Sequence, residues 1–120
     1  MTEIVKTISP LRLPRSVAER VVESAREHGL CWGTLRKADG RMCLIGHAAD
    51  VQGLVDWEMG LPFVGLAHTL GRLEDLGQYD TRQWGWTAYL RSDRLVGSGA
   101  SVDEWWRALV DGGYVIVEDD

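Results

Sequence analysis

Glycine divides this chain into short segments. Of its 120 residues, 14 are glycine, about 12% against roughly 7% in an average protein. Glycine ends helices and permits tight turns, because it adopts positive φ angles at little cost. We therefore expect short helices and strands joined by many turns. A chain of this length can bury one modest core, so residues 1–120 are expected to form a single domain.

Apolar periodicity between the glycines predicts helices. An apolar stripe from Val17 to Ala25 has helical spacing, Ser16 is a candidate cap and Gly29 is a stop signal. Near the other end of the chain, Ser101 and Glu104 have the spacing of a capping box, in which each side chain bonds the other residue's backbone. The predicted helices cover residues 14–28, 43–52, 61–76 and 101–111.

Strand signals are weaker. Residues 2–8 and 114–117 are expected to form short strands, because both segments are rich in β-branched residues. The dipeptide Asp39-Gly40 predicts a hairpin turn. Residues 84–90 fit a strand or a helix equally well. The sum is a helix-dominated α+β fold, with about four helices and a small antiparallel sheet or hairpin.

Composition and charge restrict the classes of partner. Hydrophobic residues make up 45% of the chain and no apolar run is long enough to cross a membrane. The first residues lack the apolar stretch of a secretory signal, so we expect a cytoplasmic protein. The net charge is −5, and residues 61–120 carry all of it, with five basic and ten acidic side chains. This small acidic protein is expected to have no long-range attraction for nucleic acids or anionic membranes. The acidic half fits either a basic partner or a surface that keeps the protein in solution.

Six tryptophans stand out in so short a chain. On the helix predicted for residues 101–111, Trp105 lies on the apolar stripe and is expected in the core. Trp106 is turned about 100° from it, at the flank. It lies near the acidic residues Asp103 and Asp111. A flanking tryptophan beside acids is typical of a binding hot spot for a basic partner, so these three residues are the candidate partner-binding set.

A second constellation comprises His28, Cys31, Cys43 and His47. Two cysteines and two histidines can close a tetrahedral zinc site, and the intervals of two, eleven and three residues are close to zinc-finger spacing. The simpler interpretation is two buried thiols and two ordinary histidines, with no metal and no cofactor. A third possibility is a Cys/His hydrolase, in which a histidine activates a cysteine nucleophile. A structural disulfide is not expected in a cytoplasmic protein.

Two segments resemble a known group of proteins. Gly33-Thr34-Leu35, followed after a turn by Cys43-Leu44-Ile45-Gly46, is similar to the Gly-x-Leu and Cys-Leu-x-Gly segments of small uncharacterised bacteriophage and bacterial proteins. Ser92-Asp93 and the helix led by Ser101 match later segments of that group more loosely. The resemblance implies a phage or prophage accessory protein, which would act in the cytoplasm of its host.

These observations favour a non-enzymatic accessory protein that binds a host protein, with inhibition as one form that such binding takes. The alternatives are a small zinc-stabilised binding domain, built on the four cysteine and histidine residues, and the Cys/His hydrolase.

Overall fold

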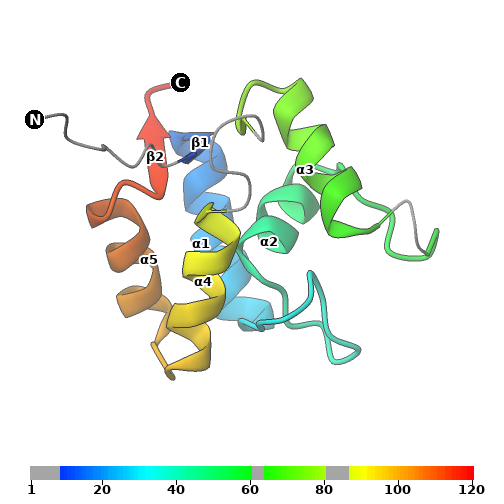
Figure 1. Ribbon diagram of the computed structural model, residues 1–120, viewed down its shortest axis with the longest axis horizontal. Helices are drawn as coiled ribbons and strands as arrows, with labels where there is room; N and C mark the ends of the chain where they lie inside the picture. The colour runs from blue at the N-terminus through cyan, green and yellow to red at the C-terminus, as the bar shows by residue number, and fades with distance from the viewer. Residues whose placement is uncertain (1–8, 61–63, 81–86) are drawn as a thin grey trace, which may run out of the picture.

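The computed structural model describes residues 9–60, 64–80 and 87–120 (Figure 1). These residues form five helices and two short strands. In chain order they are β1 (Leu11–Pro14), α1 (Arg15–His28), α2 (Leu44–Val51), α3 (Leu66–Asp75), α4 (Thr87–Gly97), α5 (Val102–Asp111) and β2 (Val115–Glu118). The expectation of a helix-dominated α+β fold is confirmed, with five helices rather than about four. The strand expected at residues 2–8 lies outside the described residues.

Local signals account for the end of α1 and the start of α5. Gly29 closes α1 at φ 88°, and its N–H donates to the carbonyl of Ala25 at 2.9 Å. The capping box at α5 is confirmed: Glu104 N–H donates to Ser101 Oγ at 3.2 Å, and Ser101 N–H donates to the Glu104 carboxylate at 3.0 Å.

The prediction that Ser16 caps α1 is wrong. Pro14 occupies the cap position and makes no side-chain cap bond. Ser16 lies inside the first turn, where its N–H donates to the Asp120 carboxylate at 3.0 Å.

The two strands pair in parallel, so the expected antiparallel sheet is wrong. Leu11 lies opposite Val115, and Leu13 lies opposite Val117. The strands come from the two ends of the described chain, with all five helices between them, and Figure 1 shows them side by side. A pairing across such a long connection is not restricted to the antiparallel direction that a tight hairpin imposes.

The hairpin expected at Asp39-Gly40 is reduced to a turn. Lys37 N–H donates to the carbonyl of Arg41 at 2.8 Å, and Gly40 adopts φ 96°. The backbone around Met42 then bridges to two different segments, in parallel to Leu30 and in antiparallel to Arg36. Because its backbone bonds are divided in this way, the segment builds no regular ladder.

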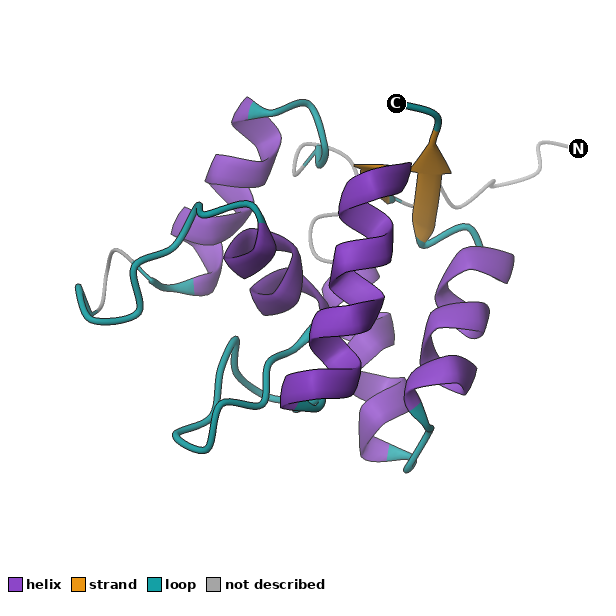
Figure 2. Cartoon of the chain, turned by 180° about the vertical axis from the view of Figure 1, so that it is seen from behind, coloured by secondary structure: helices purple, strands orange, loops and turns teal. Residues whose placement is uncertain are grey.

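Helix α1 is at the centre of the molecule. It packs against α2 on one side and α5 on the other, while α3 packs on the far side of α2 and α4 contacts both α2 and α5. Figure 2 shows α1 in front with α5 beside it. A single cluster of buried side chains joins these elements, and Trp105 is its largest member. The indole N–H of Trp105 donates to Ser92 Oγ at 2.9 Å, which fixes α5 against α4.

Two segments differ in extent from the sequence expectation. The helix expected from residue 61 begins at Leu66, and residues 61–63 lie outside the described part of the chain. The segment for which strand and helix fitted equally is helical from Thr87 onward, the first residue described after the gap. In the described ranges, no helix is both long and apolar enough to span a membrane.

Candidate protein-binding groove

A groove of about 520 Å³ runs between α1 and the neighbouring α5 and β2. Six of its eight lining residues belong to α1, and they recur at intervals of three, one, three, one and three residues, which is one face of a helix. The lining residues are Arg15, Ala18, Glu19, Val22, Glu23, Arg26, Trp106 and Val117. One side of α1 therefore packs in the core through Val21 and Ala25, and the adjoining side lines the groove.

The floor of the groove is apolar. Val22, Trp106 and Val117 are each half-buried, so each still exposes apolar surface. The ring of Trp106 lies 5.7 Å from that of the fully buried Trp105, centroid to centroid, at an interplanar angle of 44°. The expected asymmetry of the two tryptophans is confirmed. Trp106 therefore packs on a ring that belongs to the core.

Ion pairs neutralise the two ends of the groove. Arg26 of α1 pairs with Asp103 of α5 at 2.7 Å, and Arg15 pairs with Asp119 at 3.0 Å. All four side chains are exposed, so each pair contributes at most about 1 kcal/mol to folding. Asp103 thus already forms an ion pair within its own chain. Asp111, the last residue of α5, is exposed and does not line the groove.

Two other acids supply the charge of the groove. Glu19 and Glu23 lie one turn apart on α1 and are exposed. Among the residues that the structure describes, neither has an ion-pair partner. Sequence reasoning missed both residues. The signal was their spacing of four beside Ala18 and Val22, but it acquires meaning only when α5 is placed next to α1.

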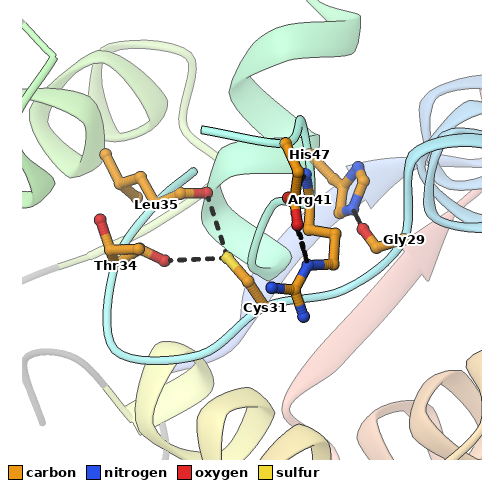
Figure 3. Close-up of polar contacts among 7 residues, drawn as sticks. Gly29, Cys31, Thr34, Leu35, Arg41 and His47 are labelled. Atoms are coloured by element: carbon orange, nitrogen blue, oxygen red, sulfur yellow. Dashed lines mark hydrogen bonds and ion pairs between the residues drawn. The ribbon is translucent and has the colours of Figure 1, made fainter. Parts of the chain in front are cut away.

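His47 is buried and both of its ring nitrogens are engaged. Its Nε2–H donates to the carbonyl of Gly29 at 2.8 Å, since a carbonyl can only accept (Figure 3). Nδ1 lies 2.9 Å from Ser24 Oγ and accepts its hydroxyl proton. Desolvation by burial lowers the pKa of His47, which keeps the ring neutral. The side chain thus ties α2 to α1 and to the glycine that ends α1.

The two cysteines are buried free thiols. Cys31 points to backbone carbonyls, with Sγ 3.4 Å from Thr34 O and 4.0 Å from Leu35 O (Figure 3). Cys43 caps α2, and its Sγ accepts from Gly46 N–H at 3.4 Å. Desolvation raises the pKa of Cys31 and raises that of Cys43 to about 12. Since the thiolate is the nucleophile and the metal ligand, both environments disfavour that chemistry.

The four residues of the possible zinc site do not come together as ligands. His28 is exposed, with its Nε2 4.0 Å from the Glu27 carboxylate, whereas His47 and both cysteines are buried in separate contacts. In the described parts of the chain, no three His, Cys, Asp or Glu side chains form a group that could hold a metal ion.

Asp93, which the sequence resemblance included without a role, has a structural one. Its carboxylate accepts from Gly33 N–H at 3.0 Å and so fastens the loop of residues 29–43 to α4. Gly33 adopts φ 81° there, a conformation that favours glycine. Desolvation raises the pKa of Asp93, and the bond from Gly33 opposes that shift.

Comparison with protein-family models, with curated proteins and with solved structures gives no match for this chain. The function is therefore argued from the groove itself.

Proposed function

We propose that this chain is a non-enzymatic protein-binding domain, which holds its partner in the groove between α1 and α5 with Trp106 as the anchor. The observation that carries the proposal is a half-buried tryptophan, supported by a core tryptophan, at the floor of an open groove. Tryptophan is the residue type most enriched at binding hot spots, and such residues are central, well packed and surrounded by polar groups. The apolar floor and the charged ends of this groove have that arrangement.

The resemblance of the Gly33–Leu35 and Cys43–Gly46 segments to phage and bacterial proteins supports a role during phage or prophage growth in a bacterial host. In that setting the chain is a phage or prophage accessory protein, and its partner is a protein of the host cytoplasm. Occupation of a functional surface on that protein would make the chain an inhibitor.

The alternatives find less support. A Cys/His hydrolase needs a thiolate, and desolvation raises the pKa of both thiols. A zinc centre built on the four cysteine and histidine residues would have to break the bonds of His47 to Ser24 and Gly29. It would also have to draw both sulfurs out of their separate backbone contacts.

Paired tryptophan variants test the proposal. Trp106→Ala removes the anchor, while Trp32→Ala removes a tryptophan that is 58% exposed on the loop of residues 29–43, outside the groove. Host lysate is passed over both immobilised variants and the wild type, and any captured protein is purified and titrated. We expect Trp106→Ala to lose about 2 kcal/mol or more of binding, roughly thirtyfold in Kd, and Trp32→Ala to bind as the wild type does.

The proposal fails if the purified partner binds Trp106→Ala and the wild type equally. It also fails if binding depends on Trp32 instead. Thermal melts of the three proteins show whether a loss of binding reflects a loss of folding.

A further inference from the structure

The groove has an excess of negative charge. Its two arginines, at the ends, are already paired with acids of the same chain, Arg15 with Asp119 and Arg26 with Asp103. The two glutamates between them have no ion-pair partner among the described residues. The middle of the groove therefore presents two free carboxylates beside an apolar floor. A partner that fits this surface supplies cations along one side of an apolar stripe.

The dimensions of the groove indicate the shape of that partner. From Arg15 to Arg26 the lining face of α1 extends over eleven residues, which is about 16 Å or three helical turns. Most of the lining belongs to α1, and Trp106 of α5 and Val117 of β2 complete the apolar floor beside it. An amphipathic helix laid between two helices buries its apolar face in this way and is a recurrent mode of recognition.

We infer that the occupant is an amphipathic helix of a partner protein, about three turns long, with lysine or arginine side chains one turn apart that pair with Glu19 and Glu23. Its apolar stripe covers Val22, Trp106 and Val117. This assignment rests on the proposed function of the groove and specifies the class of ligand. A second copy of the chain fits less well, because a symmetric dimer through this face brings the same unpaired acids of both copies together.

A random 16-residue peptide display library tests the assignment. It is selected in parallel against the wild type, the double variant Glu19→Lys/Glu23→Lys and the control Glu58→Lys/Asp75→Lys. The control makes the same change in net charge at exposed positions outside the groove. From the wild type and the control we expect peptides with apolar residues at helical spacing and lysine or arginine four residues apart. From the groove variant we expect acidic residues at those places.

Titration of one enriched peptide completes the test. It should become helical on binding by circular dichroism, and both Trp106→Ala and the groove double variant should weaken its binding at least tenfold. Enriched peptides that need Trp106 but are acidic, uncharged or extended would overturn the basic-helix assignment and leave the groove as a protein-binding site. Failure to select any Trp106-dependent peptide would count against the site as well. A wild-type dimer in sedimentation, made monomeric by Trp106→Ala, would assign the groove to a second copy.

Discussion

Gly46 offers the sharpest test of how the loop of residues 29–43 meets α2. It lies in the first turn of α2, where the carbonyl of Leu35 approaches the helix. A Cβ added at Gly46 would stand 2.3 Å from Leu35 O and 3.2 Å from the Cβ of Met42. A carbon atom cannot approach a backbone oxygen so closely, so the loop must move away from the helix.

The cost of Gly46→Ala follows from three contributions. Overpacking of a well-packed site costs about 1–3 kcal/mol. Displacement of Leu35 also weakens the bond from Cys43 N–H to its carbonyl, now 3.0 Å, for about 1 kcal/mol more. The better helix propensity of alanine returns about 1 kcal/mol. The expected net loss is about 1–3 kcal/mol, or roughly 4–12 °C in Tm for a domain of this size.

Gly71→Ala is the matched control. Gly71 lies within α3, and an added Cβ would meet no atom within 4 Å. The same substitution there should gain up to about 1 kcal/mol, because only the propensity contribution remains. Thermal and urea unfolding followed by circular dichroism give both values. If Gly46→Ala unfolds at or above the wild-type temperature, the close approach of Leu35 to α2 is wrong, whatever Gly71→Ala does.

Four further predictions are open to simple measurements. Ser101→Ala should cost about 1 kcal/mol in thermal melts by removing half of the capping box, and a loss of only a few tenths would contradict that role. Trp105→Ala should cost about 3–5 kcal/mol, and Trp106→Ala much less; equal losses would place both rings in the core. The pKa of His47 is lower in the folded than in the unfolded chain, so below about pH 6.5 the unfolded chain takes up the proton first; the stability contributed by neutral His47 is fully present above that pH and decreases as the pH falls. His47→Gln should therefore reduce the change of the urea midpoint between pH 7 and pH 5. A pH dependence equal to that of the wild type would refute this. Elemental analysis should find no stoichiometric zinc, and a chelator should leave Tm unchanged; one zinc per chain, lost together with folding, would overturn this.

Elements with local signals could be predicted from the sequence. The end of α1 follows from Gly29, whose positive φ is a property of that residue and its immediate neighbours. The start of α5 follows from Ser101 and Glu104, which satisfy each other's backbone within one turn. Such contacts depend on nothing distant in the chain, so a pattern of a few residues is enough to place them.

The sheet could not be predicted in the same way. Leu11, Arg12 and Leu13 form too short an alternation to stand out as a strand, and their partners lie more than one hundred positions away. The direction of that pairing depends on how α1 and α5 pack. The antiparallel expectation came from a hairpin signal at Asp39-Gly40, which specifies a turn but not the strands around it.

The candidate groove likewise has one part that the sequence could predict and one part that it could not. The flanking position of Trp106 follows from helical spacing alone, whereas the charge around it does not. Asp103, which was expected beside a partner, pairs with Arg26 across the α1–α5 contact. In the described part of the chain Glu19 and Glu23 have no ion-pair partner, since Arg26 pairs with Asp103 of α5 and Arg15 pairs with Asp119, just after β2. Which charges are left over is a tertiary property, and sequence spacing within one helix cannot settle it.

The residues behind the sequence resemblance meet in one place, and that place is not the groove. Gly33 N–H donates to Asp93, and the carbonyl of Leu35 accepts from Cys43 N–H and needs Gly46 to approach α2. Gly-x-Leu, Cys-Leu-x-Gly and Ser-Asp are therefore three parts of one packing arrangement, which fastens the loop of residues 29–43 to α2 and α4. A pattern with that role constrains how the loop packs and contributes no residue to the lining of the groove.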